Sequence, residues 1–243
     1  MDADEVLTAT GATKRFGHFV AVDRVDFAVS RNEAVGIVGP NGAGKTTLLN
    51  LLAGTYPLSA GSVSLDGVDV SRTDAATRCR VGIGRSHQVP RPFVDMTVFE
   101  NVFVAASCGG SRTRAEGYKA SIASLDLCGM LSNANRPAAT LGLLDRKRLE
   151  LARALATNPK VLLLDEIGAG LTDAEASELV AIIHELRAAG ITIVWIEHIL
   201  HVLLQVVDRL VCMDSGIVIA QGKPEEALAH PAVIEAYLGS GVA

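Results

Sequence analysis

The stretch Gly39-Pro40-Asn41-Gly42-Ala43-Gly44-Lys45-Thr46-Thr47 decides the fold, because it fits the pattern G-x-x-x-x-G-K-[ST] in the context that this pattern requires. An apolar segment, Ala34–Val38, precedes it, and a helical pattern over Lys45–Ala53 follows it. A glycine-rich turn that opens a helix directs several backbone N–H groups at one point and so binds phosphate. We therefore expect an α/β protein that holds a nucleotide at this loop.

Individual side chains of the loop have separate tasks in holding ATP. Lys45 would place a positive charge on the β- and γ-phosphates, and Thr46 would offer its hydroxyl to Mg²⁺. Thr47, one residue further into the helix, could reach another phosphate oxygen. The alternative is a glycine turn that binds nothing, and the flanking strand and helix argue against it. The expected ATP-binding residues of the loop are Gly39, Pro40, Asn41, Gly42, Ala43, Gly44, Lys45, Thr46 and Thr47.

A second half of the site follows the apolar segment Val161–Leu164, which ends in two acidic residues. Ligands of open α/β sheets bind where the strands end, so Asp165 would lie at the site and complete the Mg²⁺ shell. Glu166, one residue further on, could orient or deprotonate the water that attacks the phosphate. The alternative, that either acid only caps the following turn, is weakened by the presence of the phosphate loop.

Composition excludes several classes of protein. The 243 residues include 27 acidic and 22 basic side chains, so a net charge of -5 offers no electrostatic footprint for nucleic acid. Although 49% of the residues are apolar, no apolar run exceeds five residues, as in Leu179–Ile183. A spanning helix needs about 20, so we expect neither a membrane span nor, after the acidic start, a usual secretory signal. Four scattered cysteines, expected to be reduced, suit a cytoplasmic protein: Cys79, Cys108, Cys128 and Cys212.

Strand and helix patterns alternate on both sides of a helical region, Met96–Leu155. Such alternation predicts a mostly parallel sheet. Thr172 and Glu175 have the spacing of a capping box, and Gly190 stands where a left-handed residue ends a helix. A turn is expected at Asp214–Gly216. Expected strands are Val6–Thr10, Val20–Val29, Gly61–Gly67, Val81–Ile83, Val161–Leu164, Ile191–Ile196, Arg209–Met213 and Ile217–Gln221; expected helices are Lys45–Ala53, Asp173–Ala189 and Ile199–Val207.

The order of these motifs resembles that of the ATP-binding subunits of ABC transporters, from about Val6 to Gly239. The resemblance implies a P-loop NTPase of the ABC ATPase type, with a mostly parallel sheet core, an antiparallel β part and an inserted helical lobe. It implies a single nucleotide-binding domain over 1–243. Residues 1–88 and 158–243 would form the catalytic core, and 89–157 the helical lobe. It further implies ATP and Mg²⁺ as ligands and ATP hydrolysis as the activity.

Four further site residues rest on this resemblance. Gln88, in Arg85-Ser86-His87-Gln88, matches the glutamine that contacts the metal or the attacking water and couples the site to the membrane subunit. Phe16 matches the aromatic on which adenine stacks, with Val22 packed beside it; the alternative is an ordinary core aromatic. His198 matches the switch histidine that contacts the γ-phosphate. Gln88, Glu166 and His198 are the expected catalytic residues, and Thr46, Gln88 and Asp165 the expected Mg²⁺ ligands.

The signature motif is where the sequence departs from the family. Residues Leu141, Gly142, Leu143, Leu144 and Asp145 occupy the place of the pattern L-S-G-G-Q. Gly142 has no hydroxyl, two leucines replace glycines whose backbones approach the partner's γ-phosphate, and Asp145 adds an anion there. We expect this half of a dimer interface to bind ATP weakly. Ile167 also stands where the family usually has proline.

Within the family the resemblance is to the ATPases of branched-chain amino acid importers, on the segments Asp165–Thr172, Gly222–Glu226 and His230–Gly239. It implies a second ABC ATPase subunit, identical or different, and integral membrane permease subunits. A periplasmic substrate-binding protein would take part indirectly, and nucleic acid would not. The chain would work in the cytoplasm, on the inner face of the cell membrane.

Two other functions remain as alternatives. One is a regulatory subunit that binds nucleotide and rarely hydrolyses it, which the degenerate signature favours and the complete set of Lys45, Asp165, Glu166, Gln88 and His198 opposes. The other is a non-transport ABC ATPase of DNA repair or translation. Such proteins usually carry coiled-coil insertions or two cassettes in one chain, and this sequence has neither.

Overall fold

A six-stranded sheet brings the motif-bearing loops to one edge. The computed structural model describes residues 4–110 and 112–238. Strands in this sheet follow the order β10-β9-β3-β8-β7-β6, parallel from β9 to β6, with β10 antiparallel to β9. Parallel strands end on the same side, so the loops after β3, β6, β7 and β8 meet there. The strands are β3 (Ala34–Val38), β6 (Ile83–Arg85), β7 (Val161–Asp165), β8 (Thr192–Ile196), β9 (Arg209–Asp214) and β10 (Ile217–Gly222).

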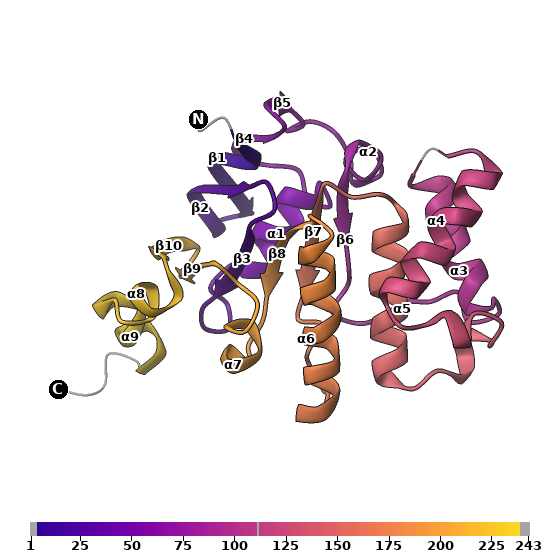
Figure 1. Ribbon diagram of the computed structural model, residues 1–243. Helices are drawn as coiled ribbons and strands as arrows, with labels where there is room; N and C mark the ends of the chain where they lie inside the picture. Colours follow the sequence, from indigo (N-terminus) through magenta and orange to yellow (C-terminus); the bar gives the residue numbers. More distant parts are fainter. Residues whose placement is uncertain (1–3, 111, 239–243) are drawn as a thin grey trace.

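A second, antiparallel sheet has the order β2-β1-β4-β5 and lies toward the amino terminus (Figure 1). Its long hairpin pairs Thr8 with Ala28 and Phe16 with Phe19. These strands are β1 (Glu5–Phe16), β2 (Phe19–Ser30), β4 (Ala60–Leu65) and β5 (Val68–Asp69).

The six-stranded sheet is covered on both faces, which explains why its central strands are continuously apolar. On one face, Val161 and Leu163 belong to a core shared with α1 (Lys45–Ala53) and the antiparallel sheet. On the other face, Leu162 and Leu164 belong to a core shared with most of the remaining helices. The phosphate loop therefore leaves the end of β3 between the two apolar cores that cover the faces of the sheet.

The segment between β6 and β7 holds the helices of the predicted lobe. Figure 1 shows α3, α4 and α5 grouped at one side of the molecule, with α8 and α9 at the opposite end. The predicted division after residues 88 and 157 falls in the loops that follow β6 and α5. The remaining helical elements are α2 (Ala75–Val81), α3 (Val98–Cys108), α4 (Arg114–Leu127), η1 (Leu131–Asn133), η2 (Ala138–Thr140), α5 (Leu143–Ala156), α6 (Asp173–Ala188), α7 (Leu200–Leu203), α8 (Pro224–Leu228) and α9 (Pro231–Leu238).

The structure confirms the helix cap, the helix end and the turn that the sequence predicted. Thr172 and Glu175 form the capping box of α6, and Gly190 has φ 83° after its end. The turn between β9 and β10 uses left-handed Ser215 and Gly216. The α/β class, with its mostly parallel sheet, antiparallel part and inserted helices, is confirmed as well.

Two element predictions were wrong. The expected strand Val81–Ile83 begins inside α2, which Asp74 caps by accepting from the N–H of Thr77 and which ends at Gly82 with φ 119°. The strand β6 starts only after that glycine. The expected helix Ile199–Val207 is one short turn, α7: Ile199 offers no side-chain cap, and after Leu204 the N–H groups of Gln205 and Val206 donate to carbonyl oxygens three residues back, which ends the α-helix.

Candidate functional site

The loop between β3 and α1 encloses the phosphate site that its sequence predicts. A cavity of about 320 Å³ opens here, lined by Phe19, Ala21, Asn41, Gly42, Ala43, Gly44, Lys45, Thr46, Thr47, Glu166 and His198. Glycine is required at Gly39 and Gly44, which have φ 149° and 97°. A Cβ at these positions would lie 2.0 Å from the carbonyl oxygen of Met213 and 2.4 Å from that of Ala21. The loop can therefore approach a phosphate closely only with these glycines.

Lys45 is buried at the base of this cavity. Its ammonium donates to the carbonyl oxygens of Gly39, at 2.6 Å, and Pro40, at 3.0 Å. Burial lowers the pKa of Lys45, and the carboxylates Glu166 and Asp165 act in the opposite direction. The positively charged ammonium of Lys45 is thus held in place inside the loop that would bind a phosphate.

Thr46 and Asp165 come together as the predicted cation site requires. Thr46 Oγ1 lies 3.4 Å from Asp165 Oδ1. Burial raises the pKa of Asp165, while Arg85 opposes the shift through an ion pair of 3.0 Å to Oδ2. A hydroxyl and a carboxylate beside a phosphate loop are the oxygen donors that Mg²⁺ takes, so the residues fit this ion.

Glu166, Gln88 and His198 form one contact group although they lie far apart in the sequence. His198 Nε2 is 2.8 Å from Glu166 Oε1, and the amide of Gln88 donates to Glu166 Oε2. The backbone of Glu166 has φ 47°, a left-handed conformation that is uncommon for residues other than glycine. Glu166, predicted from its place after the apolar strand, is therefore adjacent to Gln88 and His198, predicted from the family resemblance, and Glu166 and His198 line the phosphate cavity.

The aromatic part of the site differs from the expected arrangement. Phe16 packs edge-on against Tyr56, with ring centroids 5.5 Å apart, and lies under the ammonium of Lys14. Val22 is fully buried. The cavity lining includes Phe19 instead, which is 65% exposed. Sequence analysis missed Phe19, although its place in the same hairpin as Phe16 was a signal; an adenine contact of Phe16 or Val22 stays a prediction.

The degenerate signature lies at the start of α5 and lines no part of this chain's phosphate cavity. Gly142 is the N-cap of α5 and offers no side-chain hydrogen bond to the helix. Leu143 is 45% exposed, and Asp145 lies 3.8 Å from Arg148. Leu141 is buried in the core, whereas Gly142 and Leu143 are exposed and Leu144 is half-buried, so this part of the segment faces away from the chain's own nucleotide cavity and is open to a neighbour.

Arg85 is a site residue that sequence analysis quoted but did not assign. Besides Asp165, it donates to Asn50 Oδ1 at 2.6 Å and Thr55 Oγ1 at 3.2 Å. Its position three residues before Gln88 was the available signal. Through these contacts Arg85 connects the end of α1 with the acid expected to hold Mg²⁺.

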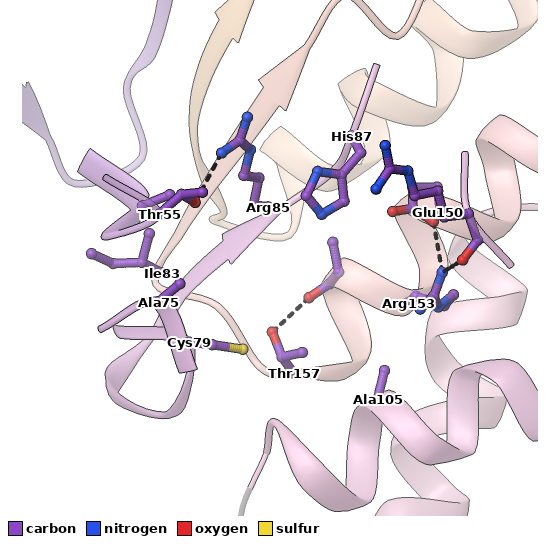
Figure 2. Close-up of a pocket in the computed structure, with 13 residues that line it drawn as sticks. Thr55, Ala75, Cys79, Ile83, Arg85, His87, Ala105, Glu150, Arg153 and Thr157 are labelled. Atoms are coloured by element: carbon purple, nitrogen blue, oxygen red, sulfur yellow. Dashed lines mark hydrogen bonds and ion pairs between the residues drawn. The ribbon is translucent and has the colours of Figure 1, made fainter. Parts of the chain in front are cut away.

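A second cavity of about 320 Å³ separates the catalytic core from the helical lobe, and we call it the interlobe groove. Figure 2 shows Arg85 and Thr55 on its core side and Glu150 and Arg153 on its lobe side, with the His87 ring between them. Arg153 donates to Glu150 at 2.8 Å and to the carbonyl oxygen of Arg91 at 2.9 Å. The groove therefore combines an apolar lining with a mainly basic set of charged side chains, and it includes Arg85, which contacts Asp165.

No helix within 4–110 or 112–238 has the length and apolar character needed to span a bilayer.

Comparisons with known proteins agree with this site. Residues 22–169 match the family described as ABC transporter, and residues 218–243 match branched-chain amino acid ATP-binding cassette transporter. The high-affinity branched-chain amino acid transport ATP-binding proteins BraF of Pseudomonas aeruginosa and LivG of Escherichia coli are 35% and 36% identical. Each alignment covers 96% of this chain and 98% of the relative.

Solved structures give the same result. The ADP conformation of an ATP-binding cassette of an ABC transporter superposes with a TM-score of 0.87 at 32% identity, covering 97% of this chain and 99% of the other. A nucleotide-free ATP-binding cassette superposes equally well, with a TM-score of 0.87 at 30% identity and the same coverage. The chain therefore belongs to the ABC transporter family, in the group of branched-chain amino acid transport ATP-binding proteins.

Proposed function

We propose that this ATPase powers an importer for branched-chain or related amino acids through separate membrane subunits. The observation that carries the proposal is the contact group of Gln88, Glu166 and His198 beside the phosphate loop. BraF and LivG are named as transport proteins for the same substrate class. A binding subunit without turnover would not need this complete set of residues.

The proposed roles follow from what each group can reach. Backbone N–H groups of the loop and the ammonium of Lys45 hold the phosphates, and Thr46 and Asp165, with Gln88, hold Mg²⁺. Bound Mg²⁺ supplies positive charge to the β- and γ-phosphates. Glu166 orients or deprotonates the attacking water, and His198, which now contacts Glu166, turns toward the γ-phosphate.

The position of the signature implies a partner ATPase. Because Leu143 and its neighbours line no part of the chain's own cavity, a signature from a second subunit would complete this site in a head-to-tail dimer. In return, the degenerate signature would serve the partner's site poorly. We therefore favour a heterodimer in which one site, the one built on Lys45 and Glu166, follows the family pattern.

We infer that a membrane permease subunit docks at the interlobe groove, which places the chain on the inner face of the cell membrane. The groove lies between the catalytic core, which would hydrolyse ATP, and the helical lobe, which would transmit the resulting motion to the membrane subunits. Arg153 also lies 5.1 Å from the ring centroid of Phe93, which anchors the loop after Gln88 to α5. A segment seated there could influence Gln88 and, through Arg85, Asp165. A periplasmic binding protein would deliver substrate to the permease.

The test is the ATPase rate of this chain alone and after mixing with the ATPase encoded beside its gene. We expect little activity alone and stimulation on mixing. Glu166→Gln should abolish the stimulated activity, whereas Glu185→Gln, at an exposed position on α6, should retain it.

Two results would contradict the proposal. Full activity of the isolated monomer would show that no partner completes the site. Tight ATP binding without stimulation on mixing would instead support the regulatory subunit, whose site binds ATP and rarely hydrolyses it.

A further inference from the structure

Glu197 is a buried carboxylate to which sequence analysis gave no role. It follows β8 directly and precedes His198, and only 2% of the residue is exposed. Taking a carboxylate out of water is costly unless hydrogen bonds replace its hydration. The groups that satisfy Glu197 therefore indicate what it holds in place.

The two oxygens of Glu197 accept hydrogen bonds from two different loops. Oε1 accepts from the N–H of Gly168 at 2.6 Å, and Oε2 accepts from the N–H of His198 at 3.0 Å. Gly168 lies two residues after Glu166. One side chain thus joins the loop that carries Glu166 to the loop that carries His198, and charge makes such bonds stronger than neutral ones.

This bridge begins where the sheet ends. Asp165 and Ile196 are the last registered pair between β7 and β8. The N–H of Glu166 still donates to the carbonyl oxygen of Ile196 at 2.9 Å. Beyond this bond, the carboxylate of Glu197 continues the connection between the two chain segments in place of ladder hydrogen bonds.

Glycine is needed at position 168 because of the nearby Glu197 side chain, and not because of an unusual backbone angle. A Cβ at residue 168 would lie 2.3 Å from Glu197 Oε1, closer than any real contact allows. Its φ lies outside the left-handed range, so alanine would be acceptable to the backbone alone. The absence of a side chain at Gly168 therefore serves the close approach of the carboxylate.

Charged groups around Glu197 come from two other segments, the loop after β7 and α5. Burial raises the pKa of Glu197, Glu166 adds to this shift, and Lys147 of α5 opposes it. Lys147 is itself buried, with a pKa lowered by burial. The first turns of α5 therefore also face this carboxylate.

We propose that Glu197 is a positioning residue, which holds Glu166 and His198 against each other by bridging the backbones of their loops. The contact it protects is the 2.8 Å distance between Glu166 Oε1 and His198 Nε2. Displacing a reacting group by about 1 Å can cost about a hundredfold in rate. The inference rests on the catalytic roles proposed above for Glu166 and His198.

Three variants and one control test the bridge in the full chain. Glu197→Gln keeps the shape but has one acceptor oxygen for two N–H donors. Gly168→Ala keeps the carboxylate and pushes it away, and the double variant combines both changes. Glu185→Gln is the matched control, a glutamate on the exposed side of α6.

The measurements are the single-turnover rate of ATP hydrolysis, the dissociation constant for ATP, and the ring nitrogen resonances of His198 by NMR. Each single variant should lower the rate at least about tenfold and change ATP affinity less than about twofold. The double variant should lose no more than the worse single one, because both remove one bridge. His198 resonances should move in these variants and not in the control.

Unchanged His198 resonances together with a wild-type rate would overturn the proposal, as would losses that multiply in the double variant. Glu166→Gln separates this failure from failure of the proposed function. If Glu166→Gln retains the wild-type rate, the assigned roles are wrong; if it is inactive while Glu197→Gln is normal, only the bridge is wrong. The NMR measurement reports on the bridge even where hydrolysis is slow.

Discussion

Burial shifts the pKa of four charged residues at the site more than any single neighbouring group does. Lys45 and Lys147 have a lowered pKa, and Asp165 and Glu197 a raised one, with burial as the main cause in each case. Burying charged groups opposes folding. The site thus accepts a loss of stability in exchange for charges held at defined positions.

The stability cost of burying Glu197 should appear as a pH dependence of the free energy of unfolding. Because its pKa is raised in the fold, its contribution to stability is fully present below the ordinary value of 4.5 and is lost as pH rises through the folded-state pKa. The free energy of unfolding of wild type, minus that of Glu197→Gln, should therefore fall as pH rises from the ordinary value of 4.5 through the folded-state pKa, by about 1.4 kcal/mol for each unit of pKa shift. Urea unfolding of both proteins across this range measures it. A constant difference would show that Glu197 has its ordinary pKa.

Among the elements, α1 depends on a buried arginine of its neighbour α2. The guanidinium of Arg78 is 1% exposed and donates to the carbonyl oxygens of Leu51, at 2.6 Å, and Leu52, at 2.9 Å. It also donates to the carbonyl oxygen of Ser71 at 3.2 Å. The last carbonyls of a helix have no partner within it, so Arg78 completes the carboxyl end of the helix whose amino end forms the phosphate loop.

Arg78→Met should therefore destabilise the fold by about 2–4 kcal/mol, since the carbonyl oxygens of Leu52 and Ser71 lose their guanidinium donor and that of Leu51 keeps only the N–H of Gly54. Arg80→Met, at an exposed position of the same helix, is the control and should stay within about 0.5 kcal/mol of wild type. Chemical denaturation with both variants measures the difference. Equal stability of the two would mean that water replaces the guanidinium.

At the scale of the whole molecule, the signature segment and the phosphate cavity of one chain do not meet. The signature opens α5 on the side of the helical lobe, whereas the cavity lies at the ends of β3, β7 and β8. Under the proposed function, hydrolysis would therefore depend on the signature that a second subunit brings. In a head-to-tail dimer of two copies, each site would receive a signature with Leu143, Leu144 and Asp145 where the family pattern has two glycines and a glutamine.

Restoring the family pattern should let the chain act with a second copy of itself. The change combines Gly142→Ser, Leu143→Gly, Leu144→Gly and Asp145→Gln. Each glycine costs the helix up to about 1 kcal/mol, and serine at the N-cap returns about 1 kcal/mol, so the fold should persist. ATPase activity of the chain alone should rise at least about tenfold and depend on protein concentration, as for dimer formation. The same protein with Glu166→Gln should be inactive, and a folded but inactive restored protein would contradict the proposal.

The sequence by itself determined the α/β class, the phosphate loop and the two acids at the end of β7. These features depend on local patterns: glycines at left-handed positions, an apolar strand, a capping box at Thr172. Family resemblance added Gln88 and His198, which no local pattern marks. The strand expected at Val81–Ile83 failed because a short apolar run reads alike in a helix and a strand, and only the cap at Asp74 separates them.

Tertiary structure alone decided which side chains meet. Glu197 looks like any acid before a histidine until β7 and β8 lie side by side and bring Gly168 within 2.6 Å of its carboxylate. Arg85 likewise becomes a partner of Asp165 only because β6 and β7 are neighbours. Such contacts join residues that are distant in the chain, and their positions depend on strand order and register. The sequence carries its local chemistry directly, whereas these pairings exist only once the sheet has formed.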